Sequence, residues 1–344
     1  MILLRILLLP FSWIFLLITH VRNYLYDRGL KPSVKFELPV ISVGNLSVGG
    51  TGKTPMIEHL IRILADEFQL ATLSRGYGRK SKGIRMASAK ESPLTIGDEP
   101  FQFYKKFGDR ITVAVGEERA LAIPTILQEY PQTEIILLDD AFQHRRVSPS
   151  LNILLSDYNR PFYKDVPLPA GRLREGRQGA ARADVIIITK CPGEISDDEM
   201  MDIEKLIRLY AEKPIFFTII RYGNPLPFSN KLASPTQNVM LISGIANPKP
   251  LEDYVRQTYT LLKHLKFKDH HTYTHSDIEA IAKEADRNPE MCIMTTEKDK
   301  VKLEMPEFQA TVNKLPFFYL PIEIDFLKDG KDFDEMVLNH VKRA

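Results

Sequence analysis

A glycine-rich segment that ends in Gly52-Lys53-Thr54 has the residue types and spacing of a phosphate-binding loop. It follows the apolar run 40–43 and precedes a helical pattern around Ile57, which is the strand–loop–helix setting of a Walker A motif. In such a loop, backbone N–H groups surround phosphate oxygens, the lysine reaches the β- and γ-phosphates, and the next hydroxyl holds Mg²⁺. The sequence therefore predicts that a nucleoside triphosphate is bound by Ser47, Val48, Gly49, Gly50, Thr51, Gly52, Lys53 and Thr54.

Ser47 occupies the position where this motif usually has its first glycine. The turn at this position is therefore expected to differ, with Gly49 and Gly50 supplying the flexibility. An ordinary glycine-rich turn would not need the Gly-Lys-Thr ending, so we favour the phosphate loop.

A carboxylate pair follows a second apolar run. Residues 135–138 lead into Asp139 and Asp140, which fits a Walker B strand whose acidic end contacts Mg²⁺ or its water. Two aspartates at a strand end can also be simple turn formers, but beside an intact Walker A segment this is the weaker interpretation. We expect Thr54, Asp139 and Asp140 to hold Mg²⁺, and Lys53 and Asp139 to take part in catalysis.

The sequence lacks a complete guanine-recognition motif, and this determines which nucleobase we expect. Guanine-binding P-loop proteins often carry Asn or Thr followed by Lys-x-Asp. Here Thr189-Lys190-Cys191-Pro192 lacks the aspartate, and the segment 296–299 (Thr-Glu-Lys-Asp) has the wrong order. Adenine is therefore the expected base.

Further polar clusters exceed what nucleotide hydrolysis alone requires. Arg75 and Arg79 follow an apolar run and could hold phosphate through paired N–H groups. Asp98 opens a predicted helix, where it could also serve as a cap. An arginine-rich turn at 169–175 and an Asp-His-His run at 269–271 lie farther along the chain. A lone histidine is more often a surface or capping residue, so each cluster is weak evidence by itself.

The elements that must position these residues alternate between apolar strand-like runs and helical patterns. Several runs are continuously apolar, as expected for strands covered on both faces of a parallel sheet. This predicts an α/β fold of the P-loop NTPase type with a mostly parallel sheet. The expected strands of that sheet are 40–43, 70–73, 111–115, 135–138, 153–155, 185–189 and 215–220.

A stretch rich in proline, glycine and asparagine at 222–230 is the best candidate for a domain boundary. Beyond it we expect a smaller α/β unit with strands at 239–242, 292–295 and 317–324 and helices near 251–262 and 276–285. The expected division is an apolar helix at 1–30, a P-loop domain at 31–228 and a smaller C-terminal domain at 229–344. The smaller domain is expected to close over the site.

The first 30 residues differ sharply from the rest in composition. Residues 6–18 are 13 consecutive positions without a charge. As a helix they would cover about 20 Å, against about 30 Å for a bilayer core. No cleavage site of a signal peptide follows. We expect an uncleaved, membrane-associated helix that lies in one leaflet, with Trp13 and Tyr24 near the interface. Burial in the protein's own core or against a dimer partner is the alternative.

The overall composition excludes several classes of protein. With 344 residues, of which 44% are hydrophobic and 26% charged, the chain can bury a core and is neither low-complexity nor disordered. The net charge of +2 gives no reason to expect nucleic acid as a partner. Two cysteines, Cys191 and Cys292, cannot form a disulfide framework and suggest a reducing compartment. No obligatory protein partner is evident.

As a set, these motifs resemble those of the tetraacyldisaccharide 4′-kinases, the lipid A 4′-kinase family. The resemblance follows family order over nearly the whole chain and includes the apolar N-terminus. One departure is Ala141, where the family usually has glycine. The segments that carry the resemblance are 43–55, 74–78, 97–100, 139–146, 169–175, 244–248, 269–271 and 296–299.

The resemblance implies ATP- and Mg²⁺-dependent phosphorylation of the 4′-hydroxyl of a tetraacylated glucosamine disaccharide 1-phosphate. It places the reaction at the cytoplasmic face of the inner membrane, with the protein bound peripherally or monotopically. It also implies a base formed by Asp98 and a histidine, for which we take His270 rather than His271 because it directly follows Asp269.

Contacts to the lipid A precursor are implied for the arginines of these motifs, namely Arg75, Arg172 and Arg174. A rival class is a membrane-associated P-loop NTPase switch without lipid kinase activity. Such a protein would hydrolyse nucleotide slowly and form no phosphorylated lipid.

Overall fold

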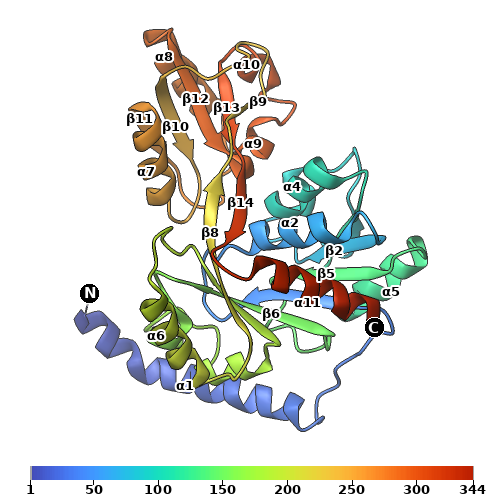
Figure 1. Ribbon diagram of the computed structural model, residues 1–344. Helices are drawn as coiled ribbons and strands as arrows, with labels where there is room; N and C mark the ends of the chain where they lie inside the picture. Colours follow the sequence, from blue (N-terminus) through green and yellow to red (C-terminus); the bar gives the residue numbers. More distant parts are fainter. Residues whose placement is uncertain (1, 344) are drawn as a thin grey trace.

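The computed structural model describes residues 2–343 and consists of a large body and a smaller lobe above it (Figure 1). The body is built on a nine-stranded sheet in the order β14-β8-β7-β6-β1-β5-β2-β4-β3. β3 and β14 run antiparallel to their neighbours, whereas the seven central strands are parallel. The strands are β1 (Val40–Asn45), β2 (Leu70–Ser74), β3 (Arg85–Met86), β4 (Thr112–Val115), β5 (Ile135–Asp139), β6 (Leu151–Asp157), β7 (Val185–Thr189), β8 (Ile215–Tyr222) and β14 (Ile322–Phe326). The predicted α/β fold with a mostly parallel sheet is confirmed.

Helices cover both faces of this sheet, which is why its central strands are apolar on both sides. One face packs against α2 (Lys53–Leu64), α4 (Asp98–Phe107) and α11 (Gly330–Arg343). The opposite face packs against α5 (Arg119–Glu129) and α6 (Asp197–Arg208). Because the strands are parallel, their carboxyl ends meet at one edge, where the loops that carry the expected site residues begin.

The small lobe, residues 226–320, has a five-stranded sheet in the order β11-β10-β12-β13-β9. The two strands β8 and β14 run side by side between body and lobe (Figure 1). The lobe's strands are β9 (Leu226–Pro227), β10 (Asn238–Ser243), β11 (Thr260–Lys266), β12 (Met291–Thr296) and β13 (Phe317–Leu320). Its helices are α7 (Lys249–Thr258), α8 (His275–Arg287), α9 (Glu297–Leu303) and α10 (Gln309–Val312). The shorter helices of the body are α3 (Pro93–Ile96), η1 (Phe162–Lys164) and η2 (Arg177–Arg182).

Three expectations for the C-terminal part differ from the structure. The helix expected over 251–262 ends at Thr258, because the following residues, from Thr260 onward, pair with β10 as the parallel strand β11. The strand expected over 317–324 is two strands, with Pro321 between them. The second of these, β14, pairs with β8 in the large sheet, and α11 packs there too, so residues 322–343 belong to the body and not to the unit expected at 229–344.

The N-terminal helix α1 (Ile2–Asp27) lies along one side of the body (Figure 1). Its part Arg5–Asp27 is long and apolar enough to cross a membrane. Ser12 is buried and bonds to the turn before η2, donating to the Pro167 carbonyl at 2.9 Å. Large apolar side chains elsewhere on the helix are exposed, including Trp13 at 66% and Leu17 at 62%. The helix is therefore docked by one face, and its apolar face is uncovered by the protein itself.

Candidate active site

The phosphate loop connects the carboxyl end of β1 to the start of α2. Gly49 and Gly52 have φ angles of 114° and 86°, a region that other residues rarely adopt. Asn45 Nδ2 donates to Thr51 Oγ1 at 2.8 Å, and Thr189 Oγ1 donates to the Thr51 carbonyl at 2.9 Å. Gly52 has no side chain that could cap α2. The first N–H groups of this helix therefore face the loop without a capping partner. This arrangement suits anionic oxygens.

The glycine that is usual at position 47 is not needed in this fold. Ser47 forms an antiparallel bridge with Leu173, and Val48 N donates to the Arg172 carbonyl at 2.8 Å. Ser47 is not among the residues with positive φ, so a side chain is tolerated without strain. The turn does differ here, because it is paired with the arginine-rich segment.

Asp140 lies between two cations at the end of β5. Arg174 donates to both of its carboxylate oxygens, at 2.8 and 3.1 Å, and Lys53 Nζ lies 3.6 Å from Oδ1. Burial alone would raise the pKa of Asp140, but Lys53 and Arg174 outweigh it and hold this pKa below its usual value. The structure thus joins the Walker A lysine, the Walker B end and the arginine-rich turn.

Asp139 has an environment of the opposite kind. Its side chain is buried, and Oδ2 accepts from Ser74 Oγ at 3.2 Å. Burial, together with the nearby Glu99 carboxylate, raises the pKa of Asp139 to about 7. Its Oδ1 has no hydrogen-bond partner among the described residues. A buried, unpartnered carboxylate oxygen beside Lys53 fits a divalent cation, which prefers oxygen ligands.

The protein does not enclose a cation by itself. Within residues 2–343, no group of three or more His, Cys, Asp and Glu side chains is arranged to hold a metal ion. Thr54, the second residue of α2, adds a hydroxyl to the two aspartates. The remaining ligands of Mg²⁺ would be phosphate oxygens and water, which is the usual case in P-loop proteins.

Arg119 is a further cation near the two aspartates, and no sequence motif pointed to it. It is buried at the start of α5, donates to the Gly116 and Glu117 carbonyls at 3.1 Å, and its Nε has no partner among the described residues. Burial lowers its pKa to about 10, against the attraction of Asp139. A buried arginine without a motif around it gives no sequence signal, because it comes close to the two aspartates only when the chain is folded.

A second cluster joins the body to the small lobe. Asp98, at the first position of α4, lies with Oδ2 3.3 Å from Nδ1 of His270. Lys302 Nζ lies 3.7 Å from the same oxygen. Burial raises the pKa of Asp98, but His270 and Lys302 outweigh it, and the net pKa lies below its usual value. The neighbouring Gly97 has a φ of 97°, and a Cβ atom at this position would lie only 3.2 Å from the Gly76 backbone, so a side chain there would be strained.

The two adjacent histidines have different surroundings. His270 has a φ of 57° and faces Asp98, with the Tyr77 ring 5.2 Å away. His271 points elsewhere, with Nε2 3.0 Å from Asp277, and stacks on Phe267. The geometry therefore places His270, and not His271, beside the carboxylate.

The other arginines that the sequence analysis singled out are not paired with Asp140. Arg75 and Arg172 are exposed near the loops that carry Asp139 and the phosphate loop. Arg172 contacts the phosphate loop through its carbonyl. Arg79 is held in an ion pair with Glu117 at 2.5 Å. These residues surround the site, but within the described part of the chain they are not joined to Asp140 in the way Arg174 is.

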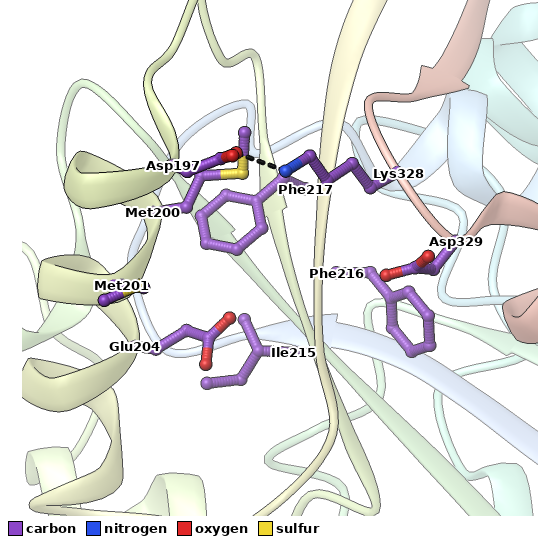
Figure 2. A pocket seen from close by; sticks show the side chains of 9 residues that line it. All are labelled: Asp197, Met200, Met201, Glu204, Ile215, Phe216, Phe217, Lys328 and Asp329. Atoms are coloured by element: carbon purple, nitrogen blue, oxygen red, sulfur yellow. Dashed lines mark hydrogen bonds and ion pairs between the residues drawn. The ribbon is translucent and has the colours of Figure 1, made fainter.

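A hollow of about 310 Å³ lies away from this site, between α6 and β8 (Figure 2). Lys328 and Asp197 pair across its mouth, and Met200 and Phe217 form part of its wall. None of the residues that line it belongs to the phosphate loop or to the Asp98–His270 pair. We assign it no role in the site.

Comparison with known proteins agrees with the motifs over almost the whole chain. A family model described as tetraacyldisaccharide-1-P 4′-kinase matches residues 4–342. The chain belongs to this family. The predicted family is thereby confirmed.

Relatives of the family are similar over their full length. Tetraacyldisaccharide 4′-kinases of Flavobacterium johnsoniae and Flavobacterium psychrophilum are 42% and 43% identical to this chain, and each alignment covers 99% of this chain and 98% of the relative. Among solved structures, the "apo" form of LpxK from Aquifex aeolicus in complex with ATP superposes with a TM-score of 0.76 at 29% identity. The match covers 98% of this chain and 99% of that one.

The departure from the family pattern at Ala141 is accommodated locally. The positive φ of this turn, 49°, belongs to Asp140, and Ala141 itself is not among the residues with positive φ. Its small side chain is buried with the cluster around Leu138 and Val147. The alanine therefore keeps the family's turn without removing either carboxylate.

Proposed function

We propose that this member of the tetraacyldisaccharide 4′-kinase family transfers the γ-phosphoryl group of ATP to the 4′-hydroxyl of a tetraacylated glucosamine disaccharide 1-phosphate. The observation that carries the proposal is the convergence of Lys53, Asp140 and Arg174 at the phosphate loop, in a chain matched to the family over residues 4–342. Such a reaction belongs to lipid A biosynthesis.

In this proposal Asp98 is the base. Its carboxylate accepts the proton of the 4′-hydroxyl as the hydroxyl oxygen forms a bond to the γ-phosphorus. The bond from that phosphorus to the β,γ-bridging oxygen breaks, and ADP leaves with the bonding electrons. A positioned base contributes typically about 10²–10⁴-fold to a rate. His270, 3.3 Å from Asp98, orients the carboxylate.

The other residues position the phosphates. Lys53 and the N–H groups of residues 47–54 hold the β- and γ-phosphates, as in other P-loop proteins. Thr54, Asp139 and Asp140 would hold Mg²⁺, which neutralises charge between the phosphates when bound. Arg174, with Arg75 and Arg172, would contact the acceptor or the moving phosphoryl group. We include Arg119 as a further buried cation facing the two aspartates.

The membrane is the proposed location of the acceptor. A lipid with four acyl chains stays in a bilayer, and the exposed face of α1 presents Trp13, Leu17 and similar side chains to it. We propose that the protein binds the cytoplasmic face of the inner membrane through residues 1–30. The small lobe supplies His270, so the base would be complete only when lobe and body are together, which would limit wasteful hydrolysis.

Two variants test the proposal with radiolabelled ATP and purified disaccharide lipid, followed by thin-layer separation. Lys53→Ala is expected to abolish the phosphorylated lipid. Asp98→Asn is expected to lower turnover by at least about 100-fold while ATP binding, measured by calorimetry, stays within about twofold. Asp66→Asn is the control, because that side chain is 78% exposed and pairs with Arg110 on the surface. Wild-type turnover in Asp98→Asn would remove the base assignment, and hydrolysis without a lipid product would favour a switch protein.

A further inference from the structure

The helix α9 carries two lysines that face the Asp98–His270 pair. It begins directly after β12, where the Thr296 hydroxyl accepts the N–H of Asp299 at 3.0 Å and caps the helix. Lys298 and Lys302 are one turn apart and so lie on the same side of α9. The segment 296–299, which has the wrong order for guanine recognition, thus lies beside the proposed base.

Lys298 contacts the ring of His270 on the side away from Asp98. Its Nζ lies 3.0 Å from Nε2 of His270, 3.2 Å from Asp269 Oδ1 and 3.8 Å from Glu99 Oε1. A lysine side chain ends in an ammonium group, so Lys298 is a hydrogen-bond donor next to this imidazole nitrogen.

The hydrogen-bond roles in this chain of contacts follow from counting donors. An ammonium group has three N–H donors and no acceptor. Nε2 of His270 must then accept from Lys298, which leaves the ring proton on Nδ1. Nδ1 faces Asp98 Oδ2 at 3.3 Å, and a carboxylate can only accept. Both contacts of the ring are satisfied by one tautomer of a neutral imidazole.

We propose that Lys298 is a positioning residue that donates to Nε2 of His270 and so holds the ring in the Nδ1–H tautomer, from which the ring donates to Asp98. This inference deepens the proposed function, because it rests on Asp98 being the base. The groups that face the ring are Asp98 from α4, Lys298 from α9, Tyr77 from the loop after β2, and Asp269 from its own loop.

Lys302 is the second lysine of α9 that lies close to Asp98. Its buried Nζ donates to the His271 carbonyl at 3.0 Å, lies 3.1 Å from Asp299 Oδ1, and is 3.7 Å from Asp98 Oδ2. Asp98 therefore has a lysine near it in addition to the imidazole ring. Both the lysine and the ring lie at Oδ2, which leaves Oδ1 for the acceptor hydroxyl.

This assignment has a consequence for the proton. Nδ1 already carries its hydrogen, so it cannot take a second proton from Asp98. The proton removed from the acceptor hydroxyl stays on Asp98 until the product has left. His270 then acts by orienting the carboxylate, and not by passing the proton onward.

The tautomer can be read directly in the full-length protein in detergent, with ¹⁵N-labelled histidine and long-range ¹H–¹⁵N correlation spectra. The chain has 8 histidines, and His270→Gln identifies the signal of interest. We expect Nδ1 to be protonated and Nε2 to be bare in the wild type. Lys298→Met should shift the signal toward the Nε2–H tautomer and lower kcat about tenfold at unchanged KM for ATP. Lys298→Arg retains a donor and should restore both the spectrum and most of the rate.

Lys300→Met is the matched control, because Lys300 lies on the same helix but faces the Tyr319 ring at 4.2 Å and Glu304 at 3.9 Å. It should change neither spectrum nor rate. A wild-type His270 that is protonated on Nε2, or a Lys298→Met protein whose His270 signal is unchanged, would overturn the inference. Lys298→Ala is the second truncation if the methionine variant fails to fold. The spectra need no substrate, so they fail or succeed separately from the kinase assay.

Discussion

Arg174 and Asp140 face each other through two nearly parallel N–H···O hydrogen bonds, of 2.8 and 3.1 Å. The arginine comes from the turn that also pairs with the phosphate loop, and the aspartate comes from the end of β5. This ion pair therefore fixes the position of the arginine-rich turn relative to the phosphates.

Replacing Arg174 by lysine tests the two-point contact. Lysine keeps the charge but cannot donate two N–H groups in one plane. We expect kcat/KM for the lipid to fall at least about tenfold, which corresponds to about 1.4 kcal/mol of transition-state stabilisation. The measurement is initial-rate kinetics at saturating ATP. Arg160→Lys, at an exposed position on another turn, should leave the rate unchanged. Equal rates in both variants would mean that charge alone is needed at 174.

A buried ion cluster links the phosphate-loop helix to the small lobe and predicts a stability effect. Lys106 of α4 lies 2.7 Å from Glu58 of α2 and 2.7 Å from Glu297 of α9, and Glu58 is fully buried. Lys106→Met would leave two carboxylates without this cation, and removing one partner of a buried pair costs about 3–5 kcal/mol. We expect a lower apparent Tm in thermal unfolding.

Lys105→Met is the control for this variant, because Lys105 is the next residue along α4 and is exposed. The double variant Glu58→Met with Lys106→Met should lose less stability than the two single variants together, since it leaves fewer unpaired charges. An unchanged Tm in Lys106→Met would show that Arg62, 3.2 Å from Glu58, is a sufficient partner.

The raised pKa of Asp139 predicts proton release when a divalent cation binds. In the metal-free protein this pKa is about 7, so the carboxyl group is partly protonated at neutral pH. A cation needs the carboxylate and expels the proton, whereas above about pH 8.5 the group is already ionised and no proton is left to release. Calorimetric titration with a preformed magnesium complex of a non-hydrolysable ATP analogue, in two buffers of different ionisation enthalpy, measures the release. Asp139→Asn should abolish it, and the same release in that variant would assign the proton to another group.

The exposed apolar face of α1 predicts that the protein binds lipid vesicles through this helix. Trp13→Glu combined with Leu17→Glu should weaken flotation with anionic vesicles by at least about 100-fold. Burial of each such side chain contributes about 1.5–3 kcal/mol. Binding of ATP should be unaffected, because both side chains face away from the body. Leu209→Glu is the control, since Leu209 is 73% exposed but lies beyond α6. Unchanged flotation in the double variant would contradict the membrane role of this face.

Much of the body was predictable because its signals are local. The continuous apolar strands, the phosphate loop and the Walker B end each follow from neighbouring residues, and Lys53, Asp139 and Asp140 are where the motifs place them. The path of the chain after Pro321 was not predictable, because the return of β14 to β8 depends on pairing between segments about a hundred residues apart. Arg119 and Lys302 were missed for a similar reason. Neither belongs to a recognisable motif, and the carboxylates near them, Asp139 and Asp98, come from other elements.

The docking of α1 has one more consequence. Asn23 donates to the buried Glu175 at 2.5 Å, and Arg22 donates to the Gln143 carbonyl at 2.6 Å. Glu175 directly follows Arg174, and Gln143 Oε1 lies 3.5 Å from Arg174 Nη1, so α1 is held against the residues that pair with Asp140. With α1 resting on a bilayer, the bound phosphates would lie at a fixed distance from the membrane surface. Only a lipid whose sugar extends that far from the bilayer could then reach them.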